Sequence, residues 1–225
     1  MYLEQNIKGL CSKFGIKYAE FIDDLDVDNV SELTIYDLEA VCEEYEVDLL
    51  SLLFKPLYRP ELWNKKLEKI KLLILDVDGV MTDGGMYFTE NGEQIKKYNT
   101  KDGMAILHLT KNEFQVAIIS SGFKSEMVKT RADLLGIQRC YVGRDPKIEV
   151  LNKYCEELNI TLENVAIIGD DVNDMEIIKK VGFSASPSDA VNTVKSQVDV
   201  VLNKKGGDGC VREFIDAYLL KQPLA

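Results

Sequence analysis

The sequence predicts a doubly wound α/β fold with a parallel sheet, preceded by a small all-helical domain. Two observations predict this arrangement. Short continuous apolar runs alternate with helical stretches through residues 70–225, whereas residues 1–58 show only helical spacing. Apolar runs of this length without polar alternation are typical of parallel strands that are covered on both faces. A chain of 225 residues is long enough for one main domain and a smaller one.

Residues 1–58 form the predicted helical domain, with four or five helices. Thr34 followed three residues later by Asp37 predicts a capping box at the start of a helix. Asp48 predicts the start of a last short helix, Leu49–Phe54. The domain weakly resembles a repressor-type helix-turn-helix module.

A linker is predicted at residues 59–69, where a proline interrupts the helical pattern and lysines cluster. The α/β domain follows at residues 70–225. An Asn-Gly pair at Asn91 and Gly92 lies between two short extended stretches and predicts an inserted β-hairpin over Met86–Tyr98. The predicted strands of the sheet are Lys71–Asp76, Val116–Ser120, Val165–Asp170, Phe183–Ala185 and Val198–Leu202. The predicted helices are Gly103–Lys111, Lys124–Leu135, Pro146–Leu158, Asp174–Val181 and Val211–Leu220.

The net charge of −11 is concentrated in the first domain. Residues 1–58 contain four Lys and Arg against thirteen Asp and Glu, a net charge of −9, whereas residues 59–225 contain 23 against 25, a net charge of −2. An acidic surface repels phosphate backbones, so we expect no nucleic-acid partner and consider a protein partner for this domain instead.

Membrane insertion and secretion are not expected, because the sequence has no apolar run of about 20 residues and no signal-peptide pattern at its start. The five cysteines are scattered without a CxxC spacing, which favours reduced thiols in the cytoplasm.

Polar residues gather where the predicted strands end. Ligands of open parallel sheets bind at the carboxyl ends of the strands. Several carboxylates beside one lysine and one hydroxyl would repel one another unless a cation lay between them, and Mg²⁺ suits such oxygen ligands. The residues concerned are Asp76, Asp78, Ser120, Lys147, Asp170, Asp171 and Asp174.

Four motifs in this order resemble the haloacid dehalogenase (HAD) superfamily. They are LLILDVDGVMTD around Asp76, IIS ending at Ser120, Lys147, and IIGDDVND ending at Asp174. The resemblance implies a Rossmann-like fold and a phosphatase that forms an aspartyl phosphate on Asp76. It also implies that Asp78 acts as general acid and base.

The same resemblance implies where Mg²⁺ and phosphate are held. Asp76, the backbone carbonyl of Asp78, and Asp170 would hold the metal, and Ser120 and Lys147 would hold the phosphoryl oxygens. Asp171 and Asp174 would orient metal-bound waters or Lys147. Superfamily members usually carry a cap domain, but residues 84–119 and 148–169 are too short to contain one.

A closer resemblance covers roughly Lys69–Tyr218 and includes DVDGVMTDG, YNTKDGMAI and GGDGCVREF. These stretches are similar to the capless 3-deoxy-D-manno-octulosonate 8-phosphate phosphatases and related sialic-acid-type phosphatases. This resemblance implies a homotetramer whose hairpins associate centrally. Gly122 stands where the octulosonate branch has arginine and the nine-carbon branch often has glutamate. The residues that the resemblance implies for the substrate and phosphate pocket, besides those above, are Ser121, Asp83, Asn99, Lys101, Asp102 and Gly103.

The function that we expect is Mg²⁺-dependent hydrolysis of a sugar acid phosphate, with 3-deoxy-D-manno-octulosonate 8-phosphate favoured. The alternative substrates are acylneuraminate or ketodeoxynonulosonate 9-phosphate. A further alternative is a non-enzymatic regulator that senses a phosphorylated ligand.

Overall fold

The computed structural model describes residues 2–90, 94–122 and 125–221 and divides the chain into two compact units. Unit 1 comprises Met1–Asn64 and unit 2 comprises Lys65–Ala225. None of the helices in these described ranges has the length and hydropathy that a membrane span requires.

The described residues of unit 1 form helices joined by short turns and loops. It contains α1 (Leu3–Lys13), α2 (Tyr18–Asp24), a 3₁₀ turn η1 (Val30–Glu32), α3 (Ile35–Glu44), α4 (Leu49–Phe54) and a second 3₁₀ turn η2 (Pro60–Leu62). α5 (Trp63–Leu67) crosses the boundary between the units, so the predicted linker is itself largely helical.

The local signals for these helices are confirmed. Thr34 and Asp37 form the predicted capping box of α3, and the Asp48 side chain accepts the backbone N–H of Ser51 at the start of α4. The buried Asn6 side chain donates to the carbonyls of Leu52 and Lys55 at 2.7 Å and so ties α1 to the end of α4. The side chains that fill the core of unit 1 are Ile7, Leu10, Cys11, Phe21, Ile22, Val30, Leu38, Val41 and Leu52.

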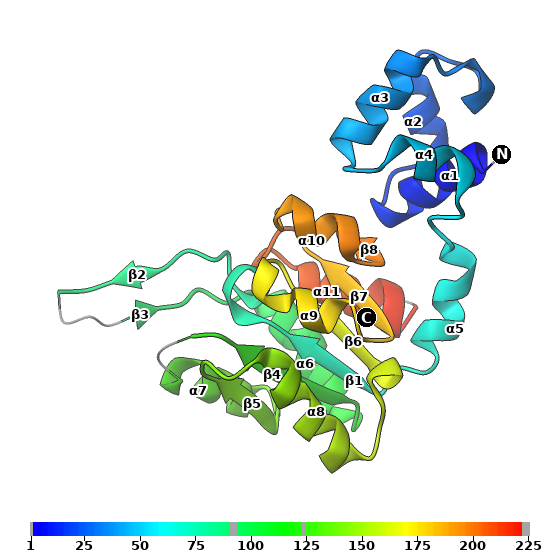
Figure 1. The fold of residues 1–225 in the computed structure, drawn as a ribbon. Coiled ribbons are helices and arrows are strands. Elements are labelled where there is room, and N and C mark those ends of the chain that lie inside the picture. The colour runs from blue at the N-terminus through cyan, green and yellow to red at the C-terminus, as the bar shows by residue number, and fades with distance from the viewer. Residues whose placement is uncertain (1, 91–93, 123–124, 222–225) are drawn as a thin grey trace. The chain divides into compact units, whose positions relative to one another are not determined.

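Unit 2 contains the predicted parallel sheet, which has six strands in the order β5-β4-β1-β6-β7-β8 among the described residues (Figure 1). The strands are β1 (Leu72–Leu75), β4 (Gln115–Ser120), β5 (Arg139–Val142), β6 (Val165–Ile168), β7 (Phe183–Ser186) and β8 (Val200–Val201). All neighbouring pairs are parallel. The central strand β1 is buried along its whole length, which explains its unbroken apolar sequence.

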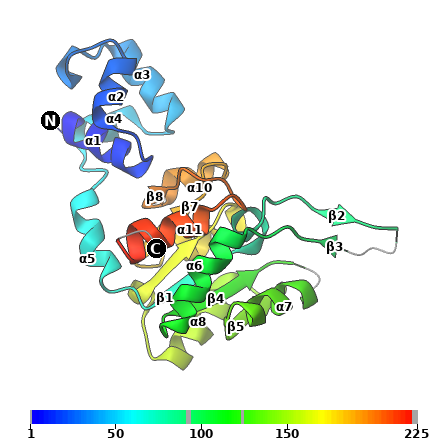
Figure 2. The same cartoon turned by 180° about the vertical axis from the view of Figure 1, so that it is seen from behind.

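Helices cover both faces of this sheet, as a doubly wound fold requires (Figures 1 and 2). One face carries α6 (Thr100–Lys111), α7 (Glu126–Leu134) and α11 (Cys210–Phe214), and the other carries α8 (Lys147–Leu158), α9 (Met175–Ile178) and α10 (Asn192–Gln197). The chain continues beyond α11 in a π-helical turn, η6 (Ile215–Leu219).

Strand β5 was missing from the sequence-based prediction. It lies at the edge of the sheet, is only partly buried and begins with Arg139, so it lacks the continuous apolar run that marked the inner strands. The predicted hairpin is present as β2 (Tyr87–Phe88) paired antiparallel with β3 (Gln94–Ile95). Its predicted Asn91-Gly92 turn lies outside the described residues, as does Lys124, the predicted first residue of the helix that begins at Glu126 in the structure.

Candidate active site

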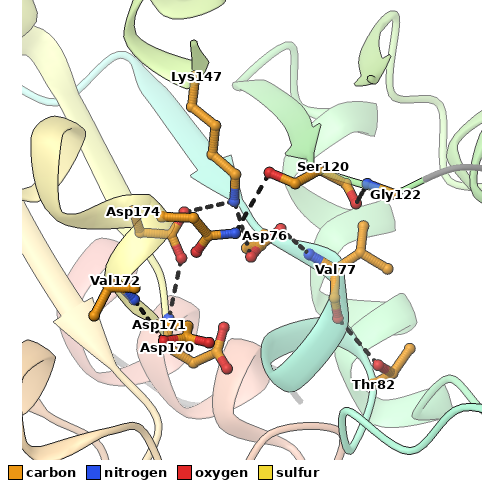
Figure 3. A network of polar contacts seen from close by, with 12 residues as sticks. Asp76, Val77, Thr82, Ser120, Gly122, Lys147, Asp170, Asp171, Val172 and Asp174 are labelled. Carbon is orange, nitrogen blue, oxygen red and sulfur yellow. Dashed lines mark hydrogen bonds and ion pairs between the residues drawn. The ribbon is translucent and has the colours of Figure 1, made fainter. Parts of the chain in front are cut away.

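The carboxyl ends of the three central strands bring the predicted site residues to one edge of the sheet (Figure 3). Asp76 directly follows β1, Ser120 is the last residue of β4, and Asp170 comes two residues after β6. The parallel register pairs Leu75 with both Ile118 and Ile168, so the chain segments beyond these strands emerge side by side. The predicted convergence of these residues thus follows directly from the strand pairing.

Lys147 lies between two buried carboxylates (Figure 3). Its Nζ is 2.9 Å from Oδ2 of Asp76 and 2.7 Å from Oδ1 of Asp174. Burial and the neighbouring charge of Asp174 raise the pKa of Asp76 to about 8. Burial lowers the pKa of Lys147, but the charges and hydrogen bonds of the two carboxylates outweigh it and raise that pKa overall. The arrangement therefore keeps Lys147 positively charged. Asp76 shares this single positive charge with Asp174.

Asp170 completes a carboxylate cluster that suits a divalent cation. One oxygen each from Asp76, Asp170 and Asp174 lies within 4.8 Å of the others. Asp170 Oδ1 is buried and has no hydrogen-bond partner among the described residues, and burial together with Asp174 and Asp171 raises the pKa of Asp170 to about 7. A hard cation beside Asp76 and Asp170 would satisfy the unpartnered oxygen and relieve the repulsion, so these two carboxylates, with Asp174 close by, fit Mg²⁺.

Asp174 also forms hydrogen bonds with two neighbours. Its Oδ1 accepts from Lys147, and its Oδ2 accepts the backbone N–H of Asp170 at 3.3 Å. These bonds fix both the ammonium group and the segment that carries Asp170. The geometry thus gives Asp174 an orienting position within the cluster.

The turn after Asp76 brings the backbone close to the cluster. Oδ1 of Asp76 accepts the backbone N–H of Val77 at 2.7 Å. Gly79 has a φ of +90°, and a Cβ placed there would lie 2.0 Å from Oδ2 of Asp170. The glycine of the DVDG sequence is therefore required both by its backbone conformation and by the nearness of Asp170.

A second glycine-rich segment, Gly206 and Gly207, packs against this turn. The backbone N–H of Gly207 donates to the carbonyl of Val80 at 2.9 Å. A Cβ at Gly206 would lie 1.9 Å from the carbonyl oxygen of Gly79. This glycine pair therefore positions the turn that follows Asp76.

The side chain of Asp78 forms an ion pair that the sequence did not predict. Its Oδ1 contacts Nζ of Lys96, which follows β3 at the base of the hairpin. The Lys96 side chain is 4% exposed, and that of Asp78 is 33% exposed. No motif in the sequence identified Lys96, because the hairpin brings it to Asp78 from 18 residues along the chain.

A pocket of about 240 Å³ opens beside the cluster. Ser120 is buried in its wall and accepts the backbone N–H of Gly122 at 3.3 Å, whereas Ser121 is exposed and accepts from the Asn173 amide at 3.4 Å. Asp171 accepts the backbone N–H of Val172 at 2.6 Å. The pocket is lined by Asp76, Asp78, Met86, Ser120, Ser121, Gly122, Asp170, Asp171 and Asn173.

Two of the residues assigned to the substrate pocket by resemblance, Asp102 and Gly103, have contacts inside unit 2. Asp102 is 3% exposed, and its Oδ1 accepts the backbone N–H of Arg212 at 2.7 Å, so it holds the start of α11. Burial raises the pKa of Asp102 to about 6. Gly103 is buried against Arg131, and a Cβ there would lie 2.3 Å from that guanidinium group.

The other residues of this set lie nearer the surface. Asp83 accepts from Lys97 at 3.2 Å and from the Gly85 backbone at 3.1 Å. Asn99 begins α6 by accepting the backbone N–H of Lys101 at 2.8 Å, and its amide donates to the Gly207 carbonyl at 3.2 Å. The Lys101 residue is exposed. Asn99 is partly buried, and none of these five residues is among those that line the pocket.

Comparisons with known proteins agree with the fold. The family described as haloacid dehalogenase-like hydrolase matches residues 143–214. The chain is 42% identical over 157 residues to the 3-deoxy-D-manno-octulosonate 8-phosphate phosphatase of Escherichia coli K12, an alignment that covers 70% of this chain and 83% of that protein.

Solved structures of similar proteins show the same architecture. The phosphatase of that name from Yersinia pestis has a TM-score of 0.68 and 37% identity, covering 71% of this chain and 85% of that one. The one from Moraxella catarrhalis, solved with magnesium ion, phosphate ion and KDO, has a TM-score of 0.69 and 32% identity, covering 73% of this chain and 94% of that one. The chain therefore belongs to the haloacid dehalogenase-like phosphatases, in the family of the 3-deoxy-D-manno-octulosonate 8-phosphate phosphatases.

Proposed function

We propose that this protein is a Mg²⁺-dependent phosphatase that hydrolyses 3-deoxy-D-manno-octulosonate 8-phosphate through an aspartyl phosphate on Asp76. The observation that carries the proposal is the position of Asp76 at the end of β1, with Lys147 at 2.9 Å and the carboxylates of Asp170 and Asp174 beside it. The relatives that share this fold at 42% and 37% identity bear the name of that activity.

In the proposed reaction, a carboxylate oxygen of Asp76 attacks phosphorus and the sugar oxygen leaves. Asp78 donates a proton to that oxygen and afterwards takes a proton from the water that hydrolyses the aspartyl phosphate. Ser120 and Lys147 hold the phosphoryl oxygens, because Ser120 lines the same pocket as Asp76 from the end of β4 and Lys147 reaches Asp76 from the start of α8.

Mg²⁺ would be held by Asp76, Asp170 and the backbone carbonyl of Asp78. When bound, it supplies positive charge that neutralises the phosphoryl oxygens. In this proposal Asp174 does not bind the metal and instead keeps Lys147 and the Asp170 backbone in place through its two hydrogen bonds. Asp171, exposed on the pocket wall, would orient water beside the metal.

The substrate is a sugar acid phosphate, and the eight-carbon compound is favoured by the relatives' names and by the KDO bound in the Moraxella catarrhalis protein. Gly122 lines the pocket without a charged side chain, so acylneuraminate and ketodeoxynonulosonate 9-phosphates are the alternatives to test. Ser121 lines the pocket and is a proposed contributor to substrate binding. Asp83, Asn99, Lys101, Asp102 and Gly103 do not line it and remain proposed contributors on the family resemblance alone.

We also propose a homotetramer in which the hairpins meet. Four apolar residues of the hairpin are about half exposed or more: Met86 at 49%, Tyr87 at 58%, Phe88 at 65% and Ile95 at 57%. Exposed apolar groups on a short two-stranded ribbon gain stability when another subunit covers them. Because Met86 also lines the pocket, hairpin association would help to close a site that has no cap.

Unit 1 is proposed to dock a protein and not to bind DNA. It carries a net charge of −9 over residues 1–58 and exposes Tyr36, Leu50 and Phe54 by more than 60% each. Deleting residues 1–58 tests this role, since unchanged mass of the assembly and unchanged partners would contradict it. All five cysteines lie in the described ranges and are unpaired, which supports the proposed cytoplasmic location.

The test of the catalytic proposal is phosphate release from a panel of sugar phosphates by the wild type and by Asp76→Asn. We expect turnover of the eight-carbon acid phosphate that requires Mg²⁺, stops with EDTA and is lost in the variant. Preference for a nine-carbon acid phosphate would move the assignment to the alternative branch. Absence of turnover across the panel would contradict the phosphatase proposal and favour a ligand-sensing regulator.

A further inference from the structure

Lys96 is a buried ammonium group that the reaction described above does not use. Its side chain is 4% exposed, and it contacts Oδ1 of Asp78. A lysine is seldom buried to this degree without a specific partner, and a charge-assisted bond to a carboxylate is stronger and more directional than a neutral one. The contact therefore fixes one carboxylate oxygen of the proposed general acid and base.

The neighbouring lysine shows how unusual this placement is. Lys97 is 69% exposed and pairs with Asp83 at 3.2 Å on the surface. An exposed pair of that kind contributes little to stability. Only Lys96, of these two adjacent lysines on the hairpin arm, is directed into the protein towards the site.

The surroundings of Asp78 explain why an ammonium group is useful there. The pocket wall also contains the carboxylates of Asp76, Asp170 and Asp171. Lys147 is paired with Asp76 and Asp174. Without Lys96, repulsion from the other carboxylates would favour rotation of the Asp78 side chain away from them and towards solvent.

We propose that Lys96 is a positioning residue that holds the Asp78 carboxyl group in line with the leaving oxygen of the substrate. The proposal rests on the acid–base role of Asp78 in the proposed function. When Asp78 gives its proton to the leaving oxygen, the O–H bond of the carboxyl group breaks, the proton joins the departing oxygen and a carboxylate remains. Lys96 stabilises the negative charge that appears on Asp78 in that step, and no proton leaves Lys96.

This role makes a selective prediction about leaving groups. Proton donation matters greatly when a poor leaving group departs and little when a good one does. The value of kcat/KM reports the steps through departure of the leaving group, so hydrolysis of the aspartyl phosphate does not affect it. Phenyl phosphate and 4-nitrophenyl phosphate differ only in the leaving group, and neither depends on recognition of a sugar acid.

The experiment measures kcat/KM for both aryl phosphates with Mg²⁺ in the wild type, Lys96→Met and Lys96→Arg. We expect Lys96→Met to lower kcat/KM for phenyl phosphate by about 10²-fold, the cost of a misplaced catalytic group. The value for 4-nitrophenyl phosphate should change far less, and Lys96→Arg should recover most of the loss because it keeps the charge. Lys97→Met is the matched control and should leave the ratio of the two values unchanged.

Equal losses with both substrates would overturn the proposal, because they would show that Lys96 maintains the pocket or binds the phosphoryl group. An unchanged ratio in an active Lys96→Met protein would overturn it as well. If the methionine variant does not fold, as judged by circular dichroism, Lys96→Gln provides the same comparison. A wild type that hydrolyses neither these esters nor any sugar acid phosphate of the panel would contradict the proposed function itself, whereas an active wild type with an unaltered variant ratio contradicts the role of Lys96 alone.

Discussion

Replacing Lys147 with methionine removes the ammonium group that lies between Asp76 and Asp174 while retaining most of the side-chain volume. The two carboxylates are 5% and 1% exposed as residues and bond to Lys147 at 2.9 and 2.7 Å. Water cannot replace the lost charge in such a buried place. We therefore expect a large decrease in the free energy of unfolding of the metal-free protein.

The size of this decrease follows from protonation. Loss of one buried positive charge forces one more carboxylate of the cluster to take up a proton. Protonating a carboxylate at pH 7, about three pH units above its ordinary pKa, costs about 4 kcal/mol. Removing one partner of a buried ion pair costs about 3–5 kcal/mol in general, which agrees with this value.

The assay is urea denaturation in EDTA, combined with hydrogen exchange measured on peptides from β1 and β6. Hydrogen exchange is needed because the chain has two units, whose unfolding need not coincide. Lys153→Met on the same helix is the matched control, because Lys153 is exposed. That variant should change stability by less than about 0.5 kcal/mol.

The pH dependence distinguishes charge from packing. The added carboxyl pKa in the variant is raised above its unfolded value, so the loss of stability is largest at high pH and disappears as pH falls towards about 4. At pH 5 the deficit should be only about 1.5 kcal/mol. A deficit equal at pH 5 and pH 7, or one below about 1 kcal/mol at pH 7, would refute the electrostatic reasoning.

Three further perturbations test other parts of unit 2. Gly79→Ala should lower the free energy of unfolding by more than about 1 kcal/mol, because φ is +90° and the new Cβ would meet Asp170. Calorimetry should also show that Mg²⁺ no longer raises the melting temperature of this variant. An undiminished rise would argue against this geometry. Burial raises the pKa of Asp102 to about 6, so its charged form destabilises the fold above that pH and this penalty vanishes near pH 4. In denaturation curves, the free energy of unfolding of Asp102→Asn should therefore exceed that of the wild type by up to about 3 kcal/mol at pH 7 and equal it at pH 4. A gain that is the same at both pH values would contradict the burial argument. Phe88→Glu should shift the sedimentation coefficient from that of the proposed tetramer to that of smaller species, since Phe88 is 65% exposed on the hairpin. An unshifted coefficient would contradict the proposed hairpin contact.

Local and periodic signals in the sequence determined most of the fold. The unbroken apolar runs at Leu72–Leu75 and Val165–Ile168 identified buried parallel strands, because only strands covered on both faces need no polar side. The capping box of Thr34 and Asp37 identified the start of α3, because its bonds join residues three apart. The edge strand at Arg139–Val142 escaped prediction because it is only partly buried and lacks a continuous apolar run.

The strand-end carboxylates were also predictable, because parallel strands end at a common edge whatever the loops between them do. That rule brings Asp76 and Asp170 together, and the DVDG sequence already indicated the glycine that their closeness requires.

Only the tertiary structure decided which groups touch. The pairing of Lys96 with Asp78, and not of Lys97, depends on the twist and course of the hairpin arm, which no spacing rule specifies. Asp102 and Gly103 lie beside each other in a motif suggestive of substrate binding, yet their contacts are with Arg212 and Arg131 inside unit 2. Sequence patterns specify which backbone forms a strand or helix, whereas the partner of a buried charge is set by long-range packing, where a rotation of one residue exchanges the side chain that faces inward.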